Sequence, residues 1–135
     1  MTRILLILLT ITSLISCSKS DDSNENEHFF GEWKLNRADL HGFEGTKTFD
    51  YSNDNIIYNF RSNGILTVTG AENVGYPSGE YSYYFGKDYL GDGTNGSKTL
   101  LVNIESSKWI YNFIDGEMVL VQSYNDGPNL IFIKN

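Results

Sequence analysis

An all-β fold, an antiparallel up-and-down β-barrel of about eight strands, is predicted by three features of the sequence. Aromatic residues are abundant, with 9 Tyr, 8 Phe and 2 Trp in 135 residues. Apolar side chains recur at every second position, and Asn-Gly and Asp-Gly pairs separate the alternating segments. Such alternation marks strands with one buried face, and these pairs supply the positive φ angles of tight hairpin turns. No amphipathic helix of ordinary length is expected.

The strands follow from the alternation in chain order. They are expected around Trp33–Leu35, more weakly near Thr46–Tyr51, and then at Ile56–Arg61, Ile65–Thr69, Tyr81–Phe85, Lys108–Ile114, Met118–Tyr124 and Leu130–Ile133. Turns are expected at Asn63-Gly64, Asp115-Gly116 and Asp126-Gly127. Closure into a barrel removes the exposed edges of such a meander, and a two-layer β-sandwich is the alternative.

The first sixteen residues have the pattern of a secretory signal. Arg3 precedes an apolar run from Ile4 to Ile15. A membrane-spanning helix needs about 20 apolar residues, so this run is too short to span a bilayer and fits the apolar core of a signal peptide. Residues 17–28 then form an expected flexible, acidic linker, and residues 29–135 the barrel domain.

The signal ends in Leu14-Ile15-Ser16-Cys17, which resembles the lipobox of bacterial lipoproteins. The resemblance implies that Cys17 carries the lipid attachment, with a diacylglycerol on sulfur and an acylated (palmitate-type) amine, and that cleavage follows Ser16. Cys17 is also the only cysteine, so it has no disulfide partner in the chain. Ser18 resembles the residue found there in outer-membrane lipoproteins, so the expected location is the outer membrane of a cell envelope. The run from Lys19 to Asp22 is similar to the export signal of surface lipoproteins.

The charge of the chain bears on its partners. Residues 1–16 contain one charged side chain, Arg3, so without them the 10 basic and 17 acidic residues become 9 and 17, a net charge of −8. A chain this acidic repels nucleic acid, and no nucleic-acid partner is expected. The expected partner is the membrane, through the N-terminal lipid anchor.

A second resemblance concerns the barrel. Phe30-Gly31-Glu32-Trp33 is similar to the Gly-x-Trp opening of lipocalin-like barrels, and Tyr58-Asn59-Phe60 followed by Asn63-Gly64 resembles the second hairpin of lipocalin-like domains in bacterial lipoproteins. The likeness extends over residues 29 to 134. Lipocalins place an arginine near the C-terminus over this Trp, and the basic residue available here is Lys134. Trp33 is accordingly assigned to the floor of the barrel.

Catalytic and metal-binding motifs are not evident in the sequence. His28 and His41 are expected to be solvent-exposed, with no nucleophile motif beside them. Two histidines and no cysteine in the domain give no recognised zinc spacing. Asp92-Gly93-Thr94-Asn95-Gly96 lacks the ligand alternation of a calcium loop. The acidic residues fall mostly in turns or on the polar parity, so we expect no enzyme activity, cofactor or metal.

The inward aromatic residues are the remaining candidates for a site: Tyr58, Phe60, Tyr81, Tyr83, Trp109 and Tyr111. A barrel of about eight strands is either filled by side chains or holds one small ligand. The first expected function is capture of a small apolar or amphipathic ligand by these residues, with segments 70–78 and 86–98 around the mouth. The alternative is a filled barrel whose loops and outer surface bind an envelope protein or a glycan.

Overall fold

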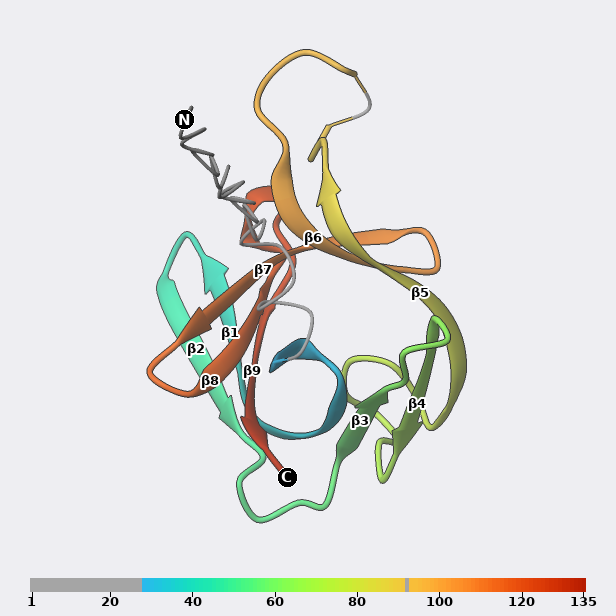
Figure 1. Cartoon of the computed structure of the whole chain (residues 1–135). Helices are drawn as coiled ribbons and strands as arrows, with labels where there is room; N and C mark the ends of the chain where they lie inside the picture. The colour runs from blue at the N-terminus through green and yellow to red at the C-terminus, as the bar shows by residue number, and fades with distance from the viewer. Residues whose placement is uncertain (1–27, 92) are drawn as a thin grey trace, which may run out of the picture.

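The computed structural model describes residues 28–91 and 93–135; the signal sequence, Cys17 and nearly all of the predicted linker lie outside the described residues. The described part is almost entirely β (Figure 1). Within it, no helix is long and apolar enough to cross a membrane. Its elements are β1 (Gly31–Gly42), β2 (Gly45–Asp50), β3 (Ile57–Phe60), β4 (Ile65–Thr69), β5 (Gly79–Asp88), β6 (Thr99–Ile104), β7 (Ser107–Ile114), β8 (Glu117–Val121), the 3₁₀ turn η1 (Ser123–Asn125) and β9 (Asn129–Lys134).

The strands close into an antiparallel barrel, as predicted. Each strand from β3 to β8 pairs with the next in the chain, β1 pairs with β3, and β9 pairs with β1 from Trp33 to Asp39, which completes the ring. Eight strands, β1 and β3 to β9, therefore form the barrel. The two-layer sandwich is not the fold of this chain.

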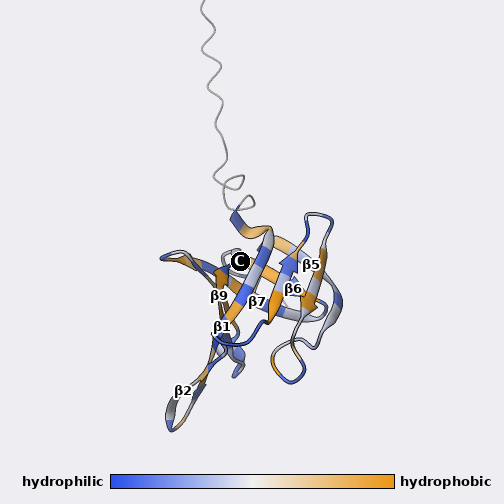
Figure 2. Cartoon of the chain, turned by 90° about the horizontal axis from the view of Figure 1, so that it is seen from below, coloured by the Kyte–Doolittle hydropathy of each residue, from blue (hydrophilic) through white to orange (hydrophobic). Residues whose placement is uncertain are grey.

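The ninth strand, β2, is an addition to the barrel. The first residues of β1 pair with β3, whereas residues Arg37 to Gly42 pair with β2. The β1–β2 hairpin thereby projects from the barrel on the side away from the C-terminus (Figure 2). Phe43 at its tip is completely exposed. The alternation near Thr46–Tyr51 predicted this strand, but most of β2 is exposed.

All the predicted strands are present, but β1 and β5 are longer than the alternation indicated, one strand ends earlier than expected, and one strand was not predicted. Asp115 and Gly116 have φ angles of 52° and 84°, which are the positive values expected for the β7–β8 turn. The strand expected to reach Tyr124 ends instead at Val121, and Tyr124 lies in η1. Strand β6 was not predicted, because its sequence Leu100–Ile104 lacks clear alternation; Leu101 and Val102 are both fully buried although they face opposite sides of the sheet.

Candidate functional site

The predicted aromatic residues do converge inside the barrel. Tyr58 and Phe60 are fully buried, Trp109, Tyr111 and Tyr83 are 4 %, 7 % and 9 % exposed, and Tyr81 is half-buried at the edge of the core. The Phe60 and Tyr83 rings meet edge to face, with their centroids 5.2 Å apart. Edge-to-face contact is a favourable geometry for aromatic pairs, so these side chains stabilise one another.

Phe29, just before β1, lies among these rings and was not predicted to be part of the site. It is fully buried, stacks on Phe85 at a centroid distance of 4.0 Å, and lies 4.6 Å from the Phe60 ring and 5.6 Å from the Tyr111 ring. A single ring thus joins aromatic side chains from β3, β5 and β7. Phe29 belongs to no alternating segment, so the strand pattern gave no signal for it.

The polar atoms of the inward aromatics have partners within the protein. The Tyr58 hydroxyl accepts a hydrogen bond from the Tyr76 amide at 3.0 Å, and the Trp109 indole N–H donates to the Tyr76 hydroxyl at 3.0 Å. The Tyr83 hydroxyl donates to the Arg61 carbonyl, and that of Tyr81 to the Pro77 carbonyl at 2.7 Å. Burial raises the pKa of Tyr58 to about 12, and that of Tyr83 to about 12 as well. These hydroxyls are therefore neutral hydrogen-bonding groups of the core.

Segment 70–78, expected to form the rim of a mouth, packs over one end of the barrel. It is closed by Ser78, whose amide and hydroxyl both donate to the Ala71 carbonyl at 2.9 Å. Gly75 has a φ of +60°, and a Cβ at this position would lie 2.5 Å from the Tyr58 hydroxyl. Only glycine allows this close approach. The loop therefore covers the tyrosine hydroxyl that a ligand would have to reach from this end.

The opposite end is closed around Trp33, the residue assigned to the floor. Its indole N–H donates to the Phe29 carbonyl at 2.7 Å, which fixes the backbone that carries the Phe29 ring. The Lys134 ammonium lies 4.3 Å from the centroid of the Trp33 ring and donates to the Phe30 carbonyl at 2.7 Å. Lys134 thus occupies the place that the resemblance gives to an arginine. Partial burial lowers the pKa of this lysine.

The two histidines are both exposed, in agreement with the prediction. His28 stacks on Phe113 at 6.0 Å. His41 bonds Thr46 at 2.9 Å and Asn129 at 3.0 Å, and so ties the β1–β2 hairpin to the start of β9. Among residues 28–91 and 93–135, no three His, Cys, Asp or Glu side chains come close enough to hold a metal ion.

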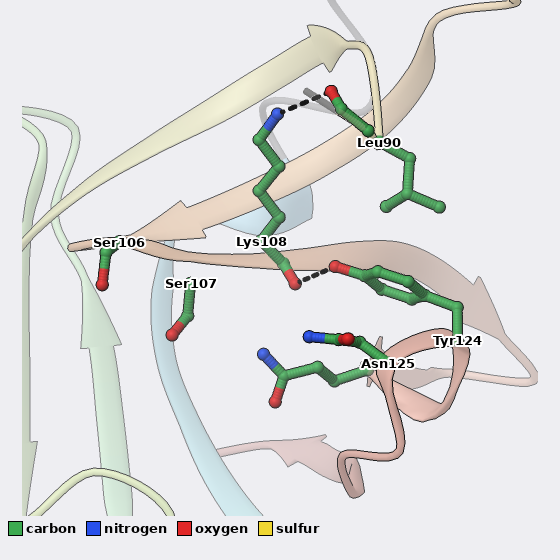
Figure 3. Close-up of a pocket in the computed structure, with 8 residues that line it drawn as sticks. Leu90, Ser106, Ser107, Lys108, Tyr124 and Asn125 are labelled. Atoms are coloured by element: carbon green, nitrogen blue, oxygen red, sulfur yellow. Dashed lines mark hydrogen bonds between the residues drawn. The ribbon is translucent and has the colours of Figure 1, made fainter. Parts of the chain in front are cut away.

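A second candidate site, which the sequence did not indicate, is a hollow of about 350 Å³ on the outside of the barrel, here called the lateral pocket (Figure 3). Its polar lining comes from Ser106, Ser107, Lys108, Gln122, Tyr124 and Asn125. Leu90 and Gly91, from the segment after β5, complete it. Three stretches that are distant in the sequence meet here, which is why the pattern of any one of them gives no signal.

No protein-family model matches the chain, and neither a curated protein nor a solved structure matches it.

Proposed function

We propose that this chain is a lipid-anchored envelope protein without catalytic activity, which binds its partner through the loops and outer surface of a filled barrel. The observation that carries this proposal is the packing of the interior. Phe29 fills the space between the inward rings, and the hydroxyls of Tyr58 and Tyr83 are engaged by the protein itself. Of the two functions expected from the sequence, this packing favours the second.

The competing function is capture of a small apolar ligand inside the barrel. Such a ligand would have to displace Phe29, a ring with no exposed surface, or open the loop that holds Tyr76 against Trp109. Moving a buried aromatic side chain into water costs about 1.5–3 kcal/mol before any hydrogen bond is broken. The interior is thus a poor receptor compared with a surface that is already open.

The lipid anchor is supported by sequence: Leu14-Ile15-Ser16-Cys17 resembles a lipobox, and the chain has no other cysteine. Two or more acyl chains provide stable membrane attachment, whereas one chain gives reversible binding. The expected location of the anchored protein is the outer membrane. Replacement of Cys17 tests the anchor directly: a Cys17→Ala chain is expected to lose metabolic labelling by fatty acid, and unchanged labelling would contradict attachment at this residue.

Native mass spectrometry of the full-length chain, purified in detergent from its own host, tests the filled barrel. The expected spectrum contains the acylated chain with no further tightly held apolar molecule. A reproducible additional mass that organic solvent releases would overturn the filled-barrel proposal and identify the class of the ligand.

A further inference from the structure

The segments around the lateral pocket are connected by hydrogen bonds. The Lys108 ammonium donates to the Tyr89 carbonyl at 2.8 Å and to the Gly91 carbonyl at 3.5 Å, which holds the segment after β5 against β7. The Tyr124 hydroxyl donates to the Lys108 carbonyl at 2.7 Å, which fixes η1 to the same strand (Figure 3). A site whose walls are held before binding loses less conformational entropy when a ligand arrives.

The turn η1, which forms part of the pocket wall, is also held in place by hydrogen bonds. The Asn129 side-chain oxygen accepts from the amides of Gln122 and Ser123, each at 3.3 Å. The Gly127 amide donates to the Gln122 carbonyl at 3.0 Å. Gly127 also lies against the Gln122 side chain, since a Cβ there would come within 2.6 Å of its amide oxygen. The Gln122 side chain therefore has a restricted position beside the pocket.

Four of the polar side chains that line the pocket have no hydrogen-bond partner within the described part of the chain. Within residues 28–91 and 93–135, the side chains of Ser106, Ser107, Gln122 and Asn125 make no intramolecular hydrogen bond. Hydroxyl and amide groups both donate and accept, so together they match a ligand that does the same at several adjacent atoms. Tyr124, which is 44 % exposed, adds an aromatic ring to this polar lining.

The lining bears on the class of ligand. It contains no carboxylate, histidine or cysteine, so no charged oxygen, imidazole or thiolate ligand is present for a metal ion. Ligand pockets for apolar molecules are lined mainly by hydrophobic and aromatic side chains, and here Leu90 is the only aliphatic one. A volume of about 350 Å³ lies at the small end of the range for small-molecule sites, roughly 300–1,000 Å³. A compact, polyhydroxylated molecule fits this volume and this polar lining.

We propose that the lateral pocket binds a saccharide unit, with the hydroxyls of Ser106 and Ser107 and the amides of Gln122 and Asn125 as its hydrogen-bonding groups and the Tyr124 ring as an apolar platform. This rests on the proposed function, because it names the class of partner that the outer surface recognises. The Lys108 ammonium, which has no carboxylate among its hydrogen-bond partners, also accommodates an acidic sugar.

Saturation-transfer NMR on the full-length chain, in a detergent without a sugar headgroup, tests the proposal. The probes are hexoses, N-acetylhexosamines, uronic acids and their disaccharides. At least one is expected to bind the unmodified chain. Asn125→Ala is expected to weaken that binding roughly two- to tenfold, the loss of one net hydrogen bond, and Tyr124→Ala to abolish it. The Asn125 side chain makes no intramolecular bond, so its removal should leave the fold intact.

Asn53→Ala is the matched control, since Asn53 is an exposed asparagine that does not line the pocket. Equal binding by the unmodified chain and this control, with weaker binding by Asn125→Ala, supports the site. Binding that none of the three substitutions changes, or no binding of any probe, overturns the saccharide site but leaves recognition by the outer surface intact. An apolar molecule released from the barrel in the mass-spectrometry experiment would overturn the proposed function instead.

Discussion

Replacement of Phe29 by alanine is the most direct perturbation of the filled interior. The Phe29 side chain is completely buried and lies within 6 Å of the rings of Phe60, Tyr83, Phe85 and Tyr111, measured between centroids. Because these neighbours come from three strands fixed in a closed ring, they cannot collapse fully into the space. The expected loss is therefore that of a fully buried aromatic truncation, about 3–5 kcal/mol.

Thermal unfolding followed by circular dichroism measures this loss. For a domain of this size, 1 kcal/mol corresponds to roughly 4 °C, so a fall in Tm of about 12–20 °C is expected. Phe43→Ala is the matched control, because the same substitution at a completely exposed ring should change stability by less than about 0.5 kcal/mol. A loss below about 1 kcal/mol for Phe29→Ala would refute the view that this ring fills the barrel.

Three further perturbations test the two ends of the barrel. Gly75→Ala should destabilise the fold by at least about 1–2 kcal/mol in denaturant titration, because its φ is +60° and the added Cβ meets the Tyr58 hydroxyl, whereas Gly42→Ala, with open space around its Cβ, should be near neutral. The pKa of Tyr58 is about 12 in the fold against an ordinary value of 10. The unfolded chain therefore releases the Tyr58 proton at a lower pH than the folded chain. The contribution of this proton to the free energy of unfolding is full below pH 10 and is lost as pH rises toward 12. Tyr58→Phe should make the fall of stability with pH shallower, and an unchanged slope of stability against pH would contradict this expectation. Lys134→Met should cost about 1–2 kcal/mol through the lost cation–π contact and hydrogen bond, with partial recovery in Lys134→Arg.

The barrel was predictable because most of its strands have one buried and one exposed face. Alternation located the strands around Tyr58 and Trp109, and the Asp115-Gly116 pair located the turn between β7 and β8. Strand β6 was not predicted, and the cause is physical. Leu101 is buried on the face opposite Val102, so the strand reads as a continuous apolar run that does not distinguish a buried strand from a buried helix.

The candidate sites depend on contacts that the sequence pattern does not contain. The sequence placed six aromatics inside but left open whether they line a cavity, because that depends on Phe29, which lies outside the strands, and on Tyr76 in the loop. The lateral pocket is harder still to predict. Its serines, Lys108 and Tyr124 come from separate segments, and each looks like an ordinary surface residue in its own stretch of sequence.

Filling of the interior has a consequence for how such a protein acquires a partner. In an eight-stranded barrel, the space inside is either packed with side chains or left for one ligand. Here Trp33 and Phe29 close one end, Tyr76 and its loop close the other, and the bonds at both ends run to backbone groups of the chain itself. A substitution that opens either end therefore costs stability before it yields a binding site.

Asn125 and Ser106 carry no such constraint: they lie on the outer surface and have no intramolecular side-chain partner in the described part of the chain. Recognition at the lateral pocket is thus free to change without loss of the fold, which is the condition under which one scaffold serves many binding functions.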